Sequence, residues 1–242
     1  MRRGLIKATS AYERFVHWLL AISCLLLCLT GLGMMFHSLN FISVIMGGMK
    51  AMKNIHNILG LVFGVSLVLA IVMWWREAGI FVLPEDWEWV KTAGGYLWHV
   101  DKVPEVGKYN PGQKMFFLTV ALFGAVMFFT GIIMWFPLSF PVELVRWMYP
   151  LHALGFVIIF AFFFVHLYLG TIGSPGSLPA MLSGWVERAW LVKQHPKWLK
   201  EMEHEGKLEV YGEEKKPAAD KENKKRRLLL MISGNQSTSA ME

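Results

Sequence analysis

The sequence predicts an all-α membrane protein: a bundle of four transmembrane helices, with both termini in the cytoplasm and a C-terminal helix at the membrane surface. Hydrophobic residues make up 55% of the 242 residues and charged residues 17%, whereas a typical soluble domain has about 25% charged residues. Four runs without charged residues are long enough to span a membrane, since about 18 apolar residues suffice. These runs are residues 15–36, 55–75, 115–137 and 149–172. The sequence lacks the extended period-two alternation of a membrane β-barrel.

Basic residues indicate how the bundle is oriented. The segments before the first run, between the second and third runs, and after the fourth run carry 21 of the 24 Lys and Arg residues. Loops rich in Lys and Arg stay in the cytoplasm, so both termini are predicted to be cytoplasmic. The net charge of +6 then reflects this topology and does not indicate a nucleic-acid partner.

The regions outside the spans differ in composition. Residues 1–178 are predicted to form the transmembrane domain. Residues 179–211 contain three tryptophans among Lys and Glu residues, which is typical of a helix at the cytoplasmic membrane–water interface. Residues 212–242 begin with a stretch rich in Lys, Glu and Arg. This last segment is predicted to be disordered, because it has too little apolar surface to bury.

Four histidines lie in or beside the predicted spans. His152 and His166 share the fourth span, where fourteen residues rise about 21 Å and turn the second side chain to within about 40° of the first. His17 lies at the start of the first span and His56 at the start of the second. Alternation of the spans across the membrane puts His56 and His152 at an outer level, and His17 and His166 at an inner level.

Paired histidines at two levels favour the binding of two b-type haems, since facing helices of a bundle supply axial nitrogen ligands to haem iron. Covalent c-type attachment is excluded, because the two cysteines form no CxxCH motif. An intramembrane histidine can instead hydrogen-bond between helices while neutral. A transporter or a plain membrane anchor would use its histidines for such packing or for proton relay. That class predicts a colourless protein.

Glycines near the histidines allow two interpretations. Gly60 and Gly64 follow His56 by one and two turns, Gly155 lies three residues after His152, and Gly170 lies beyond His166. A flat macrocycle can approach a helix closely where side chains are absent. Small residues four apart are equally typical of helix–helix packing in membranes.

The chain resembles the cytochrome b (gamma) subunit of membrane-bound formate dehydrogenase over about residues 8–205. Six motifs carry the resemblance, and the third of them is the most specific. They are ERFVHW at 13–18, NIHNILG at 54–60, VGKYNPGQKM at 106–115, LHALG at 151–155, VHLYLG at 165–170 and WLVKQHPKW at 190–198.

The resemblance implies two haem b groups with the ligands His17, His56, His152 and His166. It also implies an iron–sulfur subunit with a membrane anchor, which delivers electrons to the outer haem. A molybdenum- or tungsten-dependent catalytic subunit is expected to oxidise formate on the outer side. By this resemblance, the present chain has no formate-oxidising site. It transfers electrons through the outer and then the inner haem to a quinone, typically menaquinone, near the cytoplasmic face.

The resemblance further implies that Asn110, Gly112 and Gln113 form the quinone site, beside His166. Amide side chains and a backbone N–H are suitable donors to a quinone carbonyl. Asn-Pro-Gly is also ordinary turn chemistry before a helix. The short histidine contexts alone would equally suit the cytochrome b subunit of a nickel–iron hydrogenase or of thiosulfate reductase, which remain the alternative.

Overall fold

Four long helices dominate the fold. The computed structural model describes residues 4–212, so the predicted disordered tail lies outside the described residues from position 213 onward. The four helices are apolar and long enough to cross a membrane, which confirms the predicted all-α fold with four transmembrane helices. They are α1 (Ala11–Met35), α3 (Met49–Ala78), α5 (Pro111–Trp135) and α6 (Val142–Tyr168).

Each long helix begins several residues before its apolar run, and polar residues cap the start of two of them, α1 and α5. Ser10 and Glu13 form a reciprocal capping box at the start of α1, in which each side chain accepts the other residue's backbone N–H. Asn110 and Gln113 form the same box at the start of α5. Such boxes satisfy N–H groups that have no partner within the helix.

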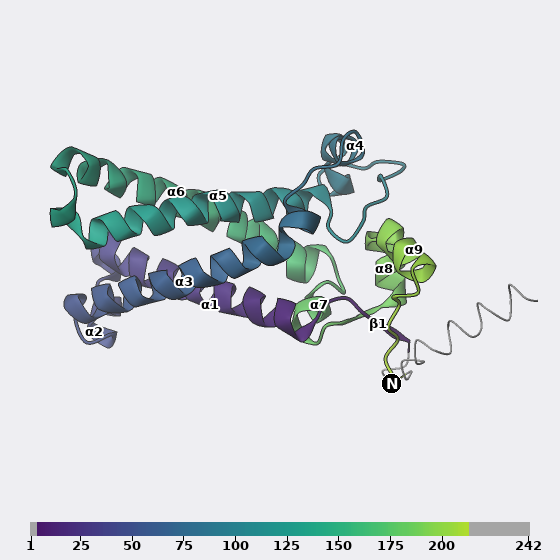
Figure 1. Ribbon diagram of the computed structural model, residues 1–242, viewed down its shortest axis with the longest axis horizontal. Coiled ribbons are helices and arrows are strands. Elements are labelled where there is room, and N and C mark those ends of the chain that lie inside the picture. The colour runs from purple at the N-terminus through teal and green to yellow at the C-terminus, as the bar shows by residue number, and fades with distance from the viewer. Residues whose placement is uncertain (1–3, 213–242) are drawn as a thin grey trace, which may run out of the picture.

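The shorter elements gather at the two ends of the bundle (Figure 1). The distal end carries the links α1-to-α3 and α5-to-α6. These are η1 (His37–Leu39), α2 (Phe41–Ile45) and η3 (Pro137–Ser139). The proximal end carries the remaining elements of the described chain. They are β1 (Leu5–Lys7), α4 (Glu85–Lys91), η2 (Ala93–Gly95), η4 (Leu169–Gly173), α7 (Leu178–Leu182), β2 (Trp185–Glu187), α8 (Arg188–Gln194) and α9 (Pro196–His204).

The long helices pack as two antiparallel pairs. Close contacts join α1 to α3 and α5 to α6, and the two pairs meet along α3 and α5. Apolar side chains also face outward, as Val65, Val68 and Val72 do along one face of α3. Exposed valines at this helical spacing are what a lipid-facing surface requires.

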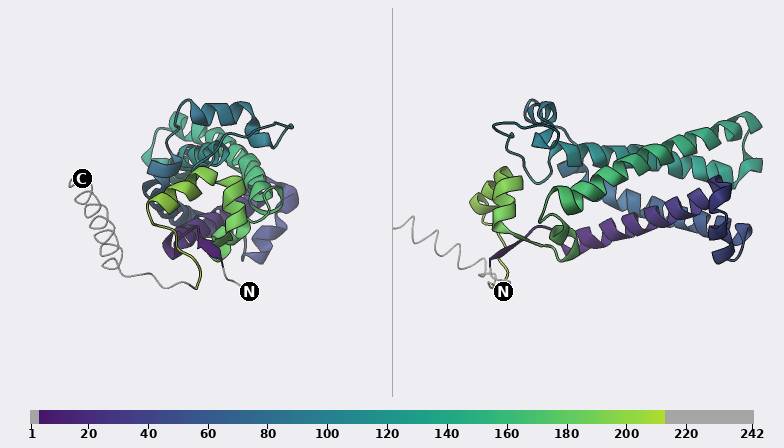
Figure 2. Two further views of the ribbon diagram at one scale, coloured as in Figure 1. Left: turned by 90° about the vertical axis from the view of Figure 1, so that its right-hand side faces the viewer. Right: turned by 180° about the vertical axis from the view of Figure 1, so that it is seen from behind.

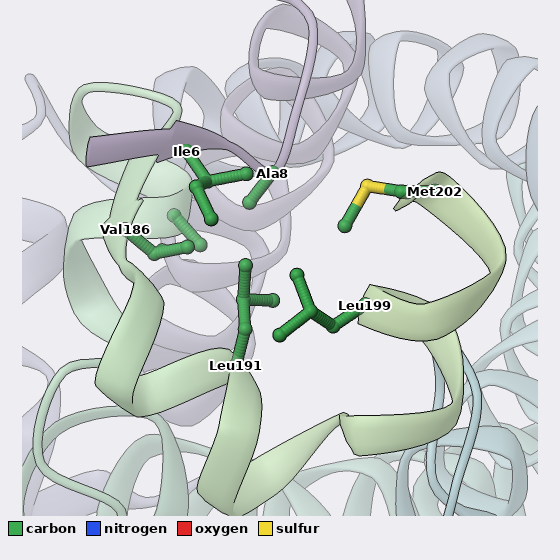
Figure 3. Packing of buried hydrophobic residues seen from close by; sticks show 7 residues of the cluster. Ile6, Ala8, Val186, Leu191, Leu199 and Met202 are labelled. Carbon is green, nitrogen blue, oxygen red and sulfur yellow. The ribbon is translucent and has the colours of Figure 1, made fainter. Parts of the chain in front are cut away.

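A small hydrophobic core closes the proximal end. Strand β1 pairs antiparallel with β2, with Ile6 opposite Val186. Figure 3 shows Ile6, Ala8 and Val186 directed toward Leu191, Leu199 and Met202 from the helical segments α8 and α9. We call the segment formed by β1, α7, β2, α8 and α9 the proximal cap. Figure 2 shows it from the end of the bundle, where α8 and α9 lie in front of the long helices.

The cap differs in detail from the helix predicted for residues 179–211. The segment does contain helices at the end of the bundle, but a strand and two breaks divide it. Gly184 has φ +86°, a left-handed conformation that ends α7 and that glycine adopts at no steric cost. Pro196 begins α9 after the break at His195, because proline cannot continue the preceding helix but suits a first helical turn.

Candidate functional site

The four intramembrane histidines lie as two facing pairs at the two ends of the bundle. In the distal pair, the ring centroids of His56 on α3 and His152 on α6 are 6.5 Å apart. In the proximal pair, the centroids of His17 on α1 and His166 on α6 are 6.2 Å apart. Helix α6 therefore contributes one histidine to each level.

Each ring of the distal pair is held by a threonine from the neighbouring helix. The distance from Thr30 Oγ1 to His56 Nδ1 is 2.7 Å, and that from Thr130 Oγ1 to His152 Nδ1 is 2.8 Å. Thr30 is fully buried and Thr130 is 4% exposed. Both hydroxyls also donate to the carbonyl oxygen four residues earlier in their own helices, at 2.8 and 2.7 Å. A hydroxyl has one proton, so each oxygen is left to accept from Nδ1–H.

A cavity of about 680 Å³ adjoins the distal pair. Its volume lies within the range of about 300–1,000 Å³ that is typical of cofactor pockets. Both distal histidines line it, together with mostly apolar side chains. Gly60 and Gly131 also line it, and a Cβ at Gly60 would meet no atom within 4 Å. Gly60 therefore leaves open space beside His56.

Other glycines serve helix packing. A Cβ at Gly64 would lie 2.3 Å from the Phe128 ring on α5, and one at Gly155 would lie 2.8 Å from Met127. Both distances are too short for a real contact, so these two glycines allow the helices to approach. Gly170, like Gly60, faces open space. The two interpretations of the glycines thus apply to different members of the set.

The proximal pair has different surroundings. The Nδ1 atom of His17 is buried without a hydrogen-bond partner, and the edge of Trp18 lies against its ring, with centroids 5.2 Å apart. The ring of His166 is stacked on Phe116, with centroids 4.3 Å apart and planes within 6°. In the described chain, aromatic rings rather than hydroxyl groups therefore surround the proximal pair.

Both pairs fit the expectation of one iron between two imidazoles. Two metal–nitrogen bonds of about 2 Å, plus about 1 Å from each nitrogen to its ring centre, separate the ring centres by about 6 Å. Within residues 4–212, no group of three or more His, Cys, Asp or Glu side chains could hold a bare metal ion. A metal at either pair would need further ligands, which a haem macrocycle supplies.

The predicted quinone motif occupies the start of α5. In the capping box, Asn110 and Gln113 use their side-chain oxygens as acceptors, which leaves their NH₂ groups available as donors. Gly112 lies in the first turn, where backbone N–H groups have no acceptor within the helix. Phe116, one turn after Gln113, contacts His166. The motif is thus about one turn of α5 from the proximal pair.

Charged residues lie next to this motif, in the loop before α5 and in its first turns. Lys108 donates hydrogen bonds to Glu13 at 2.9 Å and to Glu77 at 2.7 Å, and so ties the loop before α5 to α1 and α3. Burial opposes the charge of Lys108, but the hydrogen bonds with Glu77 and Glu13 outweigh it and raise the pKa of this lysine. Lys114 and Asp86 form a second pair at 2.6 Å, with both side chains at most 10% exposed.

His195 links the proximal cap to the same loop. Its Nδ1 lies 2.8 Å from the carbonyl oxygen of Gly107, and the residue is only 3% exposed. Burial lowers the pKa of His195, which the bond to Gly107 partly opposes. The ring is therefore neutral at neutral pH, and it donates to the carbonyl through Nδ1–H.

Several of these residues were not predicted from the sequence. Thr30 and Thr130 could have been found as Thr-Gly pairs near the distal ends of the first and third spans, at the level of His56 and His152. His195 belongs to one of the six motifs, but the motif alone gives it no role. The ion pair of Asp86 and Lys114 has no sequence signal, because 28 residues separate its members.

The chain is similar to known membrane cytochromes along most of its length. The family model described as prokaryotic cytochrome b561 matches residues 8–184. The cytochrome b556(fdo) subunit of formate dehydrogenase from Escherichia coli strain K12 is 30% identical over 204 residues, which cover 83% of this chain and 95% of that protein. The nitrate-inducible cytochrome b556(Fdn) subunit of the same strain is 30% identical over 82% of this chain and 92% of its own length.

A third relative extends the similarity to another organism. The formate dehydrogenase cytochrome b556 subunit of Haemophilus influenzae is 31% identical over 194 residues, which cover 78% of this chain and 79% of that protein. These matches confirm the resemblance that the six motifs predicted.

Proposed function

This chain belongs to the prokaryotic cytochrome b561 family, and we propose that it is the di-haem cytochrome b subunit of a membrane-bound formate dehydrogenase. The observation that carries the proposal is the presence of two facing histidine pairs at two levels of one membrane bundle. The similarity to formate dehydrogenase subunits, which spans 95% of one of them, supports this choice among respiratory complexes.

The family implies haem b as the cofactor, and we assign one haem to each pair. His56 and His152 would hold the distal haem, and His17 and His166 the proximal haem. When bound, the haems would supply one-electron oxidation and reduction at two depths of the membrane. Two histidines at each iron would dedicate it to electron transfer and leave no position for oxygen.

The proposed quinone site is formed by Asn110, Gly112 and Gln113. Their NH₂ groups and a free backbone N–H can donate to a quinone carbonyl at the start of α5. The contact between Phe116 and His166 supports the site, because it brings the motif close to the proximal pair. We propose that menaquinone is the electron acceptor there, and that electrons reach it by moving from the distal to the proximal haem.

The charge distribution supports an orientation with the proximal end in the cytoplasm of a bacterial inner membrane. Within residues 4–212, 12 of the 15 Lys and Arg residues belong to the basic segments that meet at this end. Residues 1–178 would then form the transmembrane domain and 179–211 a cytoplasmic interfacial segment. Quinone reduction would take its protons from the cytoplasm, and each charge separated across the membrane stores about 2.3 kcal/mol per 100 mV.

The proposed partners lie on the distal, periplasmic side. An iron–sulfur subunit with a membrane anchor would deliver electrons near His56 and His152. A molybdenum- or tungsten-dependent catalytic subunit would oxidise formate and pass the electrons to that subunit. The relatives are named as subunits of formate dehydrogenases, which supports an assembly of this kind.

The proposal is tested by purifying the complex from native membranes through a tag on this chain and recording its absorption spectrum anaerobically. We expect formate to reduce a b-type haem band, and a menaquinone analogue to reoxidise it. Replacing Gln113 by Leu should slow the reoxidation and leave reduction by formate intact. A Gln194→Leu variant, changed at the end of α8, is the matched control.

Two results would overturn the proposal. A complex whose haem band responds to hydrogen or thiosulfate but not to formate would assign the chain to another respiratory enzyme. A colourless complex would remove the haem assignment altogether.

A further inference from the structure

The distal pair carries a repeated feature that the proposed function does not use. Helices α1 and α5 each present a threonine to a histidine on the next long helix of the chain. Thr30 meets His56 Nδ1 at 2.7 Å, and Thr130 meets His152 Nδ1 at 2.8 Å. A glycine follows each threonine, and a Cβ on it would lie 3.6 or 3.5 Å from the Cε1 atom of the same histidine. The same arrangement thus occurs twice, once in each helix pair.

The direction of these hydrogen bonds follows from the second contact of each hydroxyl. Each threonine donates its one proton to the carbonyl oxygen four residues earlier in its helix. Its oxygen can then only accept, so the imidazole must carry its proton on Nδ1. That tautomer leaves the lone pair on Nε2, which is the nitrogen available to a metal.

The proximal pair lacks this support within residues 4–212. The Nδ1 of His17 is buried without a partner, and the ring of His166 makes aromatic contacts. A hydrogen bond from Nδ1–H to an acceptor makes an imidazole a more basic ligand. A more basic ligand stabilises ferric over ferrous iron, and so lowers the midpoint potential.

We propose that Thr30 and Thr130 are positioning residues that fix the Nδ1–H tautomer of the distal histidines and hold the distal haem at a lower midpoint potential than the proximal haem. This inference rests on the proposed assignment of one haem to each histidine pair. It supplies a reason within the chain for electrons to move from the distal to the proximal level.

The test is a redox titration of the purified complex for Thr30→Val, Thr130→Val and the double variant. The two haems are identified beforehand from the signal that His152→Ala or His166→Ala removes. We expect each valine to raise the distal midpoint potential and leave the proximal one unchanged. The expected shift corresponds to a change on the order of tenfold in the ratio of reduced to oxidised haem, which is about 59 mV for one electron. The double variant should shift the distal potential further.

Two sets of variants control for packing. Thr30→Ser and Thr130→Ser keep the hydroxyl and should restore the wild-type potential. Ser23→Ala removes a buried hydroxyl of α1 that bonds only to its own helix, and it should move neither potential.

The results separate this inference from the proposed function. Two haems with unshifted distal potentials in the valine variants would overturn the inference and leave the proposed function standing. Equal shifts of both haems would also overturn it. If a valine variant loses the distal haem, the serine variant decides: a retained haem at the wild-type potential supports the inference, and a lost haem overturns it. A wild-type chain without haem would overturn the proposed function itself.

Discussion

Each end of the bundle carries one pair of facing histidines, but the two pairs have different surroundings. Ring centroids are separated by 6.5 Å at the distal end and 6.2 Å at the proximal end. The distal rings are held by threonine hydroxyls beside a largely apolar cavity. The proximal rings contact aromatic side chains. The same end of the bundle carries two lysine–carboxylate clusters, Lys108 with Glu13 and Glu77, and Lys114 with Asp86.

Under the proposed function, this difference would let one ligand type serve two tasks. An apolar, hydrogen-bonded surround fixes a cofactor and its potential, which suits a site that only passes electrons. A site that also reduces a quinone needs donors to its carbonyl groups and a route for protons. Those polar groups occur at the proximal end, at the start of α5 and in the loop before it.

The largest expected effect comes from the buried charges Asp86 and Lys114, which within residues 4–212 lie at the proximal end. Replacing Lys114 by Met leaves the carboxylate of Asp86 buried without its ion pair, which typically costs about 3–5 kcal/mol. We expect a strong fall in thermal stability, measured by circular dichroism in detergent. Lys91→Met breaks an exposed pair with Glu88 and should have little effect. Equal effects of the two variants would contradict the structural role of the Asp86 pair.

The packing of α3 against α5 supports both ends, so disturbing it should affect both haems. A methyl group at Gly64 would overlap the Phe128 ring, because its Cβ would lie 2.3 Å away. We expect Gly64→Ala to destabilise the fold by about 1–3 kcal/mol, with haem lost from both levels in the absorption spectrum. Gly60→Ala is the matched control for thermal stability only, since its Cβ meets no protein atom within 4 Å but would enter the open space beside His56. A milder effect at Gly64 than at Gly60 would refute this packing.

A substitution with a smaller expected effect should change the signal of the proximal haem alone. Phe116 stacks on His166, and aromatic pairs of this kind contribute about 0.5–1.5 kcal/mol. Phe116→Leu should alter the electron paramagnetic resonance signal of the proximal ferric haem, because the ligand ring loses its stacking partner. The distal signal should stay unchanged. A change in both signals would show that the two levels are not independent.

The smallest expected effect is a pH dependence confined to the proximal cap. Burial lowers the pKa of His195 below its ordinary value of 6.5, so the unfolded chain takes up a proton at higher pH than the folded chain. The contribution of His195 to the free energy of unfolding is complete above about pH 6.5. It declines as the pH falls below that value, by at most about 1.4 kcal/mol per pH unit.

Melting temperatures at about pH 7.5 and about pH 5.5 measure this effect. We expect His195→Asn to lose less stability than the wild type between the two values, because an amide can donate to Gly107 but does not titrate. A variant with the same pH dependence as the wild type would rule out His195 as the titrating group.

Much of the fold could be predicted because hydropathy and helix geometry act locally. Long apolar runs define the spans, and counting membrane crossings assigns His56 and His152 to one level without any three-dimensional information. The same count assigns His17 and His166 to the other level. The structure added the distances between these rings and the surroundings that make the two levels different.

The remaining features depend on contacts between distant segments. Strands β1 and β2 have three residues each, too few to show an alternating pattern, and they pair across about 180 residues of sequence. The bond between His195 and Gly107 spans 88 residues. Thr30 and Thr130 look like ordinary small polar residues of a membrane helix until the facing histidines are placed.

The central claim is that each histidine pair holds one haem, and the haem content of the purified chain tests it most directly. A pyridine haemochrome assay, referenced to protein concentration, should give two b haems per wild-type chain. His152→Ala and His166→Ala should each retain one haem, and reduced-minus-oxidised spectra should show that different haems remain. A wild-type chain with one haem or none, or two variants that retain the same haem, would contradict the claim.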